Sequence, residues 1–248
     1  MGIGAQLYTL REKFETPEQI NAALKAVKEM GYDSVQLYGG GLDLIKQLAY
    51  GAKLAGLKIV GVLITIKSCE CFDEELFSLC REYGIPDIGI SGSYADCKEY
   101  EPYIQRVNLY AARARKEGFS FSYHNHSHEF ITLEDGFTGM HHFIEGFSHD
   151  VDFMPDTYWL QDGGKDIRLF IEQLKGRIKI LHLKDMKRTE QGNTFAEVGS
   201  GNLSFKEIIK TAREIGVEEF VVEQDRCDFD SLLSLQKSLS NIKAIMEG

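Results

Sequence analysis

Eight short β-rich runs alternate with eight amphipathic helical stretches along the whole chain, and this alternation restricts the fold more than any other feature of the sequence. It is typical of βα units, whose strands pair in parallel. The predicted strands are Ile3–Tyr8, Ser34–Tyr38, Lys58–Ile64, Asp87–Ile90, Ser120–His124, Asp152–Pro155, Ile178–Leu183 and Phe220–Gln224. The helices are predicted to begin near Pro17, Leu42, Asp73, Lys98, Gly136, Lys165, Ser204 and Ser231.

The chain length fits one closed barrel of eight such units. Its 248 residues are close to the roughly 250 of an eight-fold β/α barrel, and no linker-like segment divides them. An open doubly wound sheet is the alternative fold. Its first strand is normally followed by a glycine-rich phosphate-binding turn, but this chain has Thr9-Leu10-Arg11-Glu12 there. We therefore predict a single (β/α)8 TIM barrel domain over residues 1–248.

Charge and cysteine usage narrow the expected partners and compartment. The formal net charge of -10 argues against a nucleic-acid partner. Five cysteines without a paired framework indicate reduced thiols and a cytoplasmic protein. Cys69 and Cys71 as ligands of a soft metal are a weakly supported alternative. Neither a signal peptide nor a membrane span is expected.

Polar residues follow the last four predicted strands, where the functional residues of a barrel lie. The segments are Tyr123–Phe130, Asp156–Trp159, His182–Asp185 and Glu223–Asp225. Because the ends of neighbouring parallel strands converge around a closed barrel, one side chain from each segment is expected at a common point. The predicted ligands of one divalent metal ion are Glu129, Asp156, His182 and Glu223. Three carboxylates and one imidazole favour Mn²⁺, with Mg²⁺, Co²⁺ and Zn²⁺ as alternatives.

Each of these residues also has a purely structural alternative. Asp156 could cap a turn, and His182 could be a hydrogen-bonded core histidine. Glu223 and Asp225 could pair with Lys184 or with Arg226. Four such coincidences at four successive strand ends are less probable than one shared site, and we therefore retain the metal prediction.

Other side chains near the strand ends are predicted to contact the substrate. His124 and His126 are two residues apart and should share one face of the strand. A second metal site, or the orientation of metal ligands, is the alternative role of this histidine cluster. Lys184 is expected to polarise a substrate oxygen or to bind a phosphate, and pairing with Asp185 or Asp225 is its structural alternative. Trp159 either stacks on a sugar face or only packs at the rim of the cleft. Gly199-Ser200-Gly201 is either a phosphate cradle or, as we prefer, a helix-entry loop.

At these positions the sequence resembles the sugar phosphate isomerase/epimerase family of xylose-isomerase-like TIM barrels. The resemblance spans the chain. The shared motifs are Y-H-N-H-x-x-E-F at Tyr123–Phe130, D-x-x-W at Asp156–Trp159, H-x-K-D at His182–Asp185 and V-E-x-D at Val222–Asp225, with similar segments at Leu7–Arg11 and Glu197–Gly201.

The resemblance implies the same metal ligands and a carbohydrate enzyme. In the ketose epimerases of this superfamily a metal binds vicinal sugar oxygens while two glutamates move a proton at the adjacent carbon, which makes Glu129 and Glu223 the candidate catalytic residues here. The sequence departs from those epimerases at Trp159, where they tend to carry histidine. Gln36 and Thr65 replace a glutamate and a histidine of many relatives, so the resemblance does not identify the substrate.

Three functions compete at this point. The first is a metal-dependent sugar isomerase or epimerase that removes a proton next to a carbonyl. The second is a lyase or dehydratase acting on a keto-sugar, an inosose or a 3-keto-glycoside. The third is a DNA-repair enzyme like endonuclease IV, which the net charge and the single histidine among the predicted metal ligands disfavour. A small sugar or sugar derivative is the predicted partner, no membrane is involved, and a homo-oligomer is left open.

Overall fold

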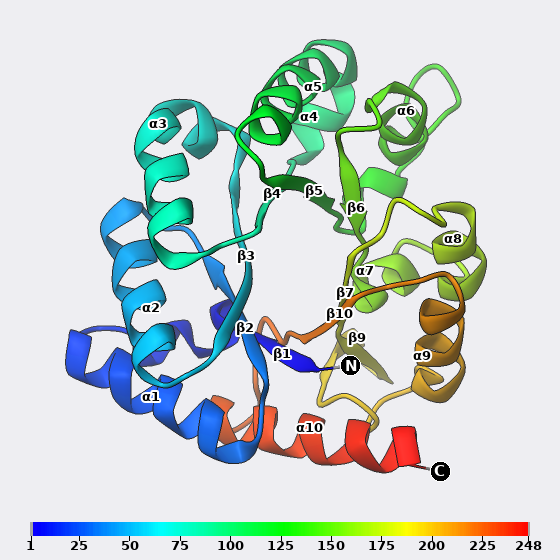
Figure 1. Cartoon of the computed structure of the whole chain (residues 1–248). Coiled ribbons are helices and arrows are strands. Elements are labelled where there is room, and N and C mark those ends of the chain that lie inside the picture. Colours follow the sequence, from blue (N-terminus) through cyan, green and yellow to red (C-terminus); the bar gives the residue numbers. More distant parts are fainter. Residues whose placement is uncertain (1, 248) are drawn as a thin grey trace.

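Eight parallel strands form a nearly closed barrel in a computed structural model that describes residues 2–247 (Figure 1). The barrel strands are β1 (Ile3–Gln6), β2 (Ser34–Tyr38), β3 (Lys58–Thr65), β4 (Asp87–Ser91), β5 (Ser120–His124), β6 (Asp152–Met154), β7 (Ile180–Leu183) and β10 (Glu219–Val222). Their order is β6-β5-β4-β3-β2-β1-β10-β7. Parallel bridges pair Phe153 with Ile178 and Asp156 with His182, which links β6 to β7 and completes the ring. The predicted TIM barrel is confirmed.

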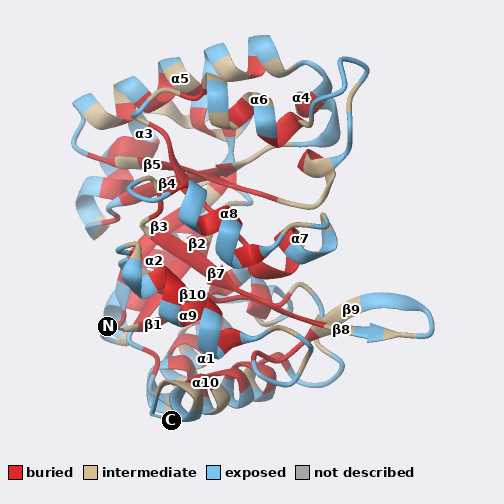
Figure 2. Cartoon of the chain, turned by 90° about the vertical axis from the view of Figure 1, so that its right-hand side faces the viewer, coloured by how far each residue is buried: buried red, intermediate tan, exposed pale blue. Residues whose placement is uncertain are grey.

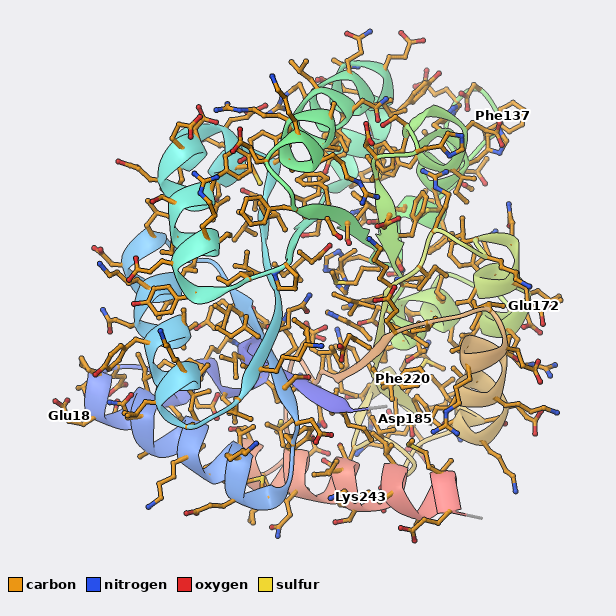
Figure 3. The ribbon with its side chains drawn as sticks, in the orientation of Figure 1. Glu18, Phe137, Glu172, Asp185, Phe220 and Lys243 are labelled. Carbon is orange, nitrogen blue, oxygen red and sulfur yellow. The ribbon has the colours of Figure 1, made fainter. Side chains whose placement is uncertain are left out.

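Helices surround the strands on the outside of the barrel. They are α1 (Pro17–Met30), α2 (Leu42–Leu54), α3 (Ile66–Tyr83), α4 (Tyr94–Lys98), α5 (Tyr100–Lys116), α6 (Gly139–Gly146), α7 (Thr157–Asp162), α8 (Ile167–Gln173), α9 (Phe205–Glu214) and α10 (Ser231–Glu247), with the 3-10 helices η1 (Leu7–Lys13) and η2 (His128–Phe130). Glu18 and Glu172 project from this outer layer, whereas Phe220 lies in the barrel wall (Figure 3). Among residues 2–247, no helix has the length and apolar character needed to cross a membrane.

The first βα unit shows how local sequence sets the boundaries of an element. The Thr16 hydroxyl accepts a hydrogen bond from the Gln19 backbone N–H, and the Gln19 side chain accepts one from the Thr16 backbone N–H. Pro17 occupies the first turn, where a missing N–H costs nothing. Gly31 ends the helix with a φ of 97°, which a residue with a Cβ rarely adopts.

Several elements differ from the sequence prediction. Helix α3 begins at Ile66 rather than near Asp73, because the Thr65 side chain accepts a hydrogen bond from the Ser68 backbone N–H and caps it. Asp73 breaks this helix with a φ of 40°. A hairpin of β8 (Asp185–Thr189) and β9 (Gly192–Ala196) projects from the barrel (Figure 2). Neither this hairpin nor α7 was predicted.

A small apolar cluster fills the inside of the barrel beneath the polar strand ends. Its members are Val60, Met154, Ile180 and Val221. Because side chains two apart on a strand share a face, Met154, Ile180 and Val221 point the same way as the polar residues Asp156, His182 and Glu223. The inward face therefore changes from apolar to polar within one pair of residues, and the apolar layer is the floor of the site described next.

Candidate metal centre

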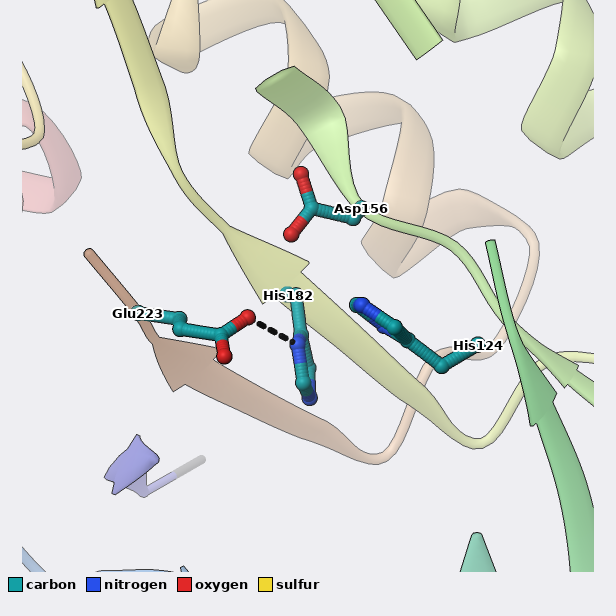
Figure 4. Close-up of side chains that lie close together, drawn as sticks. All are labelled: His124, Asp156, His182 and Glu223. Carbon is teal, nitrogen blue, oxygen red and sulfur yellow. Dashed lines mark hydrogen bonds and ion pairs between the residues drawn. The ribbon is translucent and has the colours of Figure 1, made fainter. Parts of the chain in front are cut away.

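Four buried side chains meet at the C-terminal ends of β5, β6, β7 and β10 (Figure 4). The four are His124, Asp156, His182 and Glu223, and each offers one ligand atom within 4.8 Å of the others. Three of them belong to the predicted ligand set. The structure adds His124, which had been predicted to contact substrate, and it does not bring Glu129 into this group.

His182 is oriented from both sides of its ring. Its Nε2 lies 2.7 Å from Gln36 Oε1, which also accepts a hydrogen bond from Gln6 Nε2. Since Gln36 Oε1 can only accept, a neutral His182 carries its proton on Nε2. Its Nδ1 then directs a lone pair toward Glu223 Oε2, 2.9 Å away. Two acceptors this close need a proton or a cation between them, which suits a metal-ligating pair.

Asp156 is fixed in place by the backbone around it. Its Oδ1 accepts a hydrogen bond from the Trp159 backbone N–H and caps α7, so the structural alternative also occurs. The Asp156 backbone N–H donates to Asn125 Oδ1 at 3.1 Å. Burial raises the pKa of Asp156 to about 6, against the opposing effect of the nearby Lys184 ammonium. The second oxygen, Oδ2, points into the group.

His124 brings a buried nitrogen without a hydrogen bond. Its Nδ1 has no hydrogen-bond partner among residues 2–247, and only 2% of the residue is exposed. Burial, together with the neighbouring rings of His182 and His126, holds the pKa of His124 well below its usual range, so the ring is neutral. A neutral imidazole with a free lone pair is the form that binds a metal ion.

Lys184 lies among the same carboxylates. Its Nζ is 2.9 Å from Asp156 Oδ2, 3.0 Å from Glu223 Oε2 and 2.7 Å from Asp225 Oδ2. Burial opposes the charged form, but the three carboxylates outweigh it and raise the pKa of Lys184. Burial opposes the charged form of Glu223 too, but the same ammonium is the strongest of the effects that outweigh it and hold the pKa of that carboxyl well below its usual range. The ion pairs of Glu223 and Asp225 with Lys184, which were the structural alternative for these two residues, are therefore present.

Glu129 belongs to a second group, together with His126 and His128. Its two oxygens accept hydrogen bonds from the Tyr123 hydroxyl at 2.9 Å and from the His126 backbone N–H at 2.8 Å. Burial raises the pKa of Glu129 to about 8. The carboxyl therefore binds a proton near neutral pH, and the ligand role expected of it stays a prediction.

The raised pKa of Glu129 predicts how stability changes with pH. Between the ordinary value of 4.5 and about 8, the folded protein binds one more proton than the unfolded chain, so the free energy of unfolding falls as the pH rises through this range. Over this range wild type should lose about 2–5 kcal/mol of unfolding free energy, and Glu129→Gln should not show this loss. Urea unfolding in EDTA at pH 5.5, 7.0 and 8.5 measures this. Glu134→Gln, at an exposed position, is the control and should behave like wild type. The prediction would be contradicted if the free energy of unfolding changed equally with pH in wild type and in both variants.

A cavity of about 230 Å³ opens beside the four-residue group. Its wall includes Tyr8, Tyr38, Gly39, Leu63, Ile64, Thr65, Ser91, His124, His126, Glu223 and Asp225. His124 and His126 both face it, and burial lowers the pKa of His126 to about 4, which keeps this ring neutral. Trp159 is next to His126, with the two ring centroids 5.4 Å apart. Gln36 is buried under His182 and does not line the cavity.

The loop Gly199-Ser200-Gly201 has its backbone donors occupied. The N–H groups of Gly199 and Gly201 donate to Asp185 Oδ2 at 3.0 and 2.8 Å, and the Leu203 N–H donates to Oδ1 at 3.2 Å. An internal carboxylate thus takes the place that a phosphate would need. This supports the helix-entry loop.

A sequence profile of the xylose isomerase-like TIM barrel family matches residues 24–244. The chain belongs to this family. The match covers seven of the eight barrel strands and every residue of both histidine-containing groups. A search of curated proteins found no match.

Several solved structures share the barrel of this xylose isomerase-like protein. A sugar phosphate isomerase/epimerase from Parabacteroides distasonis has 21% sequence identity and a TM-score of 0.80 over 97% of both chains. The probable 3-DHS dehydratase AsbF from Bacillus anthracis has 14% identity and a TM-score of 0.74 over 98% of this chain and 99% of its own. A family member from Mycobacterium smegmatis, solved with magnesium, has 16% identity and a TM-score of 0.72 over 99% of this chain and 96% of its own. At these identities the similarity shows the fold.

Proposed function

We propose that this protein is a metal-dependent isomerase or epimerase of a sugar or sugar derivative. The observation that supports it best is the meeting of His124, Asp156, His182 and Glu223 at the strand ends, next to a cavity that Glu223 itself lines. Catalytic groups of TIM barrels lie at this end of the strands. The sugar phosphate isomerase/epimerase from Parabacteroides distasonis, which has the same fold, agrees with this reaction class.

The residues present suit a divalent cation. His124, Asp156, His182 and Glu223 would hold it through two imidazole nitrogens and two carboxylate oxygens, and the unpaired Nδ1 of His124 is the donor that most needs it. When bound, the ion would stabilise negative charge that develops on a substrate oxygen. A second imidazole in place of a carboxylate moves the preference toward Co²⁺ or Zn²⁺ and away from Mg²⁺.

Glu223 is the proposed base. It faces the cavity, and its low pKa keeps it ionised at neutral pH, so it can accept the proton next to a substrate carbonyl. Its Oε2 lies between the His182 ring, 2.9 Å away, and the Lys184 ammonium, 3.0 Å away.

Glu129 is proposed as the second proton carrier. Its pKa of about 8 provides the protonated form from which a proton can be returned near neutral pH. The carboxyl is enclosed by Tyr123 and His126, so it must turn toward the cavity to act. His124, His126, Lys184 and Trp159 stay the proposed substrate contacts, with His124 also in the proposed ligand set.

Solvent deuterium tests the proposed reaction. Metal-loaded protein is incubated in D₂O with ketoses, inososes and 3-keto-glycosides, and the sugars are followed by NMR. Deuterium incorporation together with a new epimer or isomer supports the proposal. Loss of water or of a glycosidic alcohol would identify a lyase, which shares the first proton abstraction. The absence of exchange across the panel would contradict both.

The nuclease alternative is tested separately. The two neighbouring groups contain four histidines, more than the single histidine of the predicted ligand set. The net charge of -10 and the carboxylates at the cavity nevertheless repel a phosphodiester backbone. Metal-dependent cleavage of DNA containing an abasic site would overturn the proposed function.

A further inference from the structure

The Lys184 ammonium is itself the cation that neutralises two of the four proposed metal ligands. It contacts Asp156 Oδ2 at 2.9 Å and Glu223 Oε2 at 3.0 Å. A metal ion would bind carboxylate oxygens at about 2.0–2.2 Å, and it would repel an ammonium held against the same two atoms. Both cations therefore require the same two carboxylates.

Asp225 provides a separate place for the displaced ammonium. Its Oδ2 is the nearest of the three carboxylate oxygens to Lys184, at 2.7 Å. Asp225 is outside the four-residue ligand set, yet it lines the same cavity. Lys184 can thus release Asp156 and Glu223 without losing its last counter-charge.

The charges agree with such an exchange. The carboxylates of Asp156, Glu223 and Asp225 carry three negative charges and Lys184 carries one positive charge, which leaves two negative charges in a buried region. One divalent ion balances these two charges. In the favoured metal-bound state Lys184 therefore stays charged and pairs with Asp225 alone. Without the Lys184 ammonium, the Asp225 carboxylate would have no partner.

We propose that Lys184 is an internal competitor of the metal ion, which holds Asp156 and Glu223 until the metal takes them and then remains on Asp225. This inference rests on the proposed metal site. It gives Lys184 a part in metal binding in addition to substrate contact, and it makes Asp225 a positioning residue for the displaced ammonium.

Two substitutions should change zinc affinity in opposite directions. Lys184→Met removes the competing charge and should tighten Zn²⁺ binding at least about tenfold. Asp225→Asn leaves the displaced ammonium without a counter-charge and should weaken binding at least about tenfold. Isothermal titration of the chelator-treated full chain with Zn²⁺ measures both affinities without any assay of activity.

Thermal unfolding provides a second readout. In EDTA, Lys184→Met should unfold at a lower temperature than wild type, because the buried carboxylates of Asp156 and Glu223 and the partly exposed one of Asp225 lose their partner. Saturating Zn²⁺ should then raise its melting temperature by more than that of wild type. The matched control is Lys187→Met, an exposed lysine of the hairpin that pairs with Asp228. It should change neither measurement.

The outcomes separate the inference from the metal site beneath it. Tighter binding by Lys184→Met with weaker binding by Asp225→Asn supports both. Equal affinities in wild type and both variants would overturn the competition and leave the metal site standing. If wild type and both variants fail to bind Zn²⁺, the metal site itself is wrong. If Lys184→Met does not fold, the Zn²⁺ affinity of Asp225→Asn decides. Weaker binding than wild type supports the inference, and unchanged binding overturns it.

Discussion

Glu223→Gln should lower kcat by about 10³-fold or more, even when the metal is saturating. The substitution keeps the size of the side chain but removes the negative charge that faces the cavity, pairs with His182 and Lys184 and completes the proposed ligand set. The amide cannot accept the substrate proton. The measurement is turnover of the substrate identified by the deuterium experiment, together with the metal content of the variant.

The control for this substitution lies on the same strand. Glu219 is at the other end of β10, where it pairs with the exposed Lys58. Glu219→Gln should keep kcat within about twofold and change stability by no more than about 1 kcal/mol. If Glu223→Gln kept wild-type activity, the proposed base would be wrong.

His124→Ala and Glu129→Gln should differ sharply in metal binding. His124 lies in the four-residue group, and its removal should weaken metal binding by more than the 10–100-fold that is typical of residues outside a ligand set. Glu129 is occupied by Tyr123 and His126, so Glu129→Gln should change affinity by less than about tenfold. Dialysis against Mn²⁺ followed by metal analysis measures the stoichiometry of each variant.

The exposed His141 on α6 is the matched histidine control. His141→Ala should bind metal like wild type. The reverse pattern, with metal lost in Glu129→Gln and kept in His124→Ala, would support the ligand set expected from the sequence and contradict the one proposed from the structure.

Most of the barrel could be predicted because its information is local. Strand runs, helix caps and glycine stops such as Gly31 depend on neighbouring residues, and the structure places all eight strands where they were expected. The hairpin of β8 and β9 was missed because most of its residues are polar, so it shows no apolar alternation. The cap by Thr65, which starts α3 at Ile66, was also missed.

Three members of the four-residue group could be found from the sequence. Asp156, His182 and Glu223 each stand where a strand gives way to polar residues, and parallel strands bring their ends together. Strand β5 was harder, because a run of polar residues follows it. The turn η2 directs Glu129 back to the Tyr123 hydroxyl, and His124, the last residue of the strand, faces the group instead. The same strand-end rule would have selected His124.

The environment of Lys184 could not be predicted from its motif. H-x-K-D places Lys184 and Asp185 side by side in the sequence, yet Lys184 reaches carboxylates that follow two other strands, while Asp185 turns away to bind the backbone of residues 199–203. Contacts between distant strand ends depend on barrel closure and on side-chain direction, which the spacing of residues within one motif does not contain.

Anomalous diffraction from crystals soaked in Mn²⁺ locates the metal directly. We expect one peak, bonded to His124, Asp156, His182 and Glu223, with the Lys184 ammonium moved to Asp225. A peak among His126, His128 and Glu129, or no peak inside the barrel at all, would contradict the proposed metal centre.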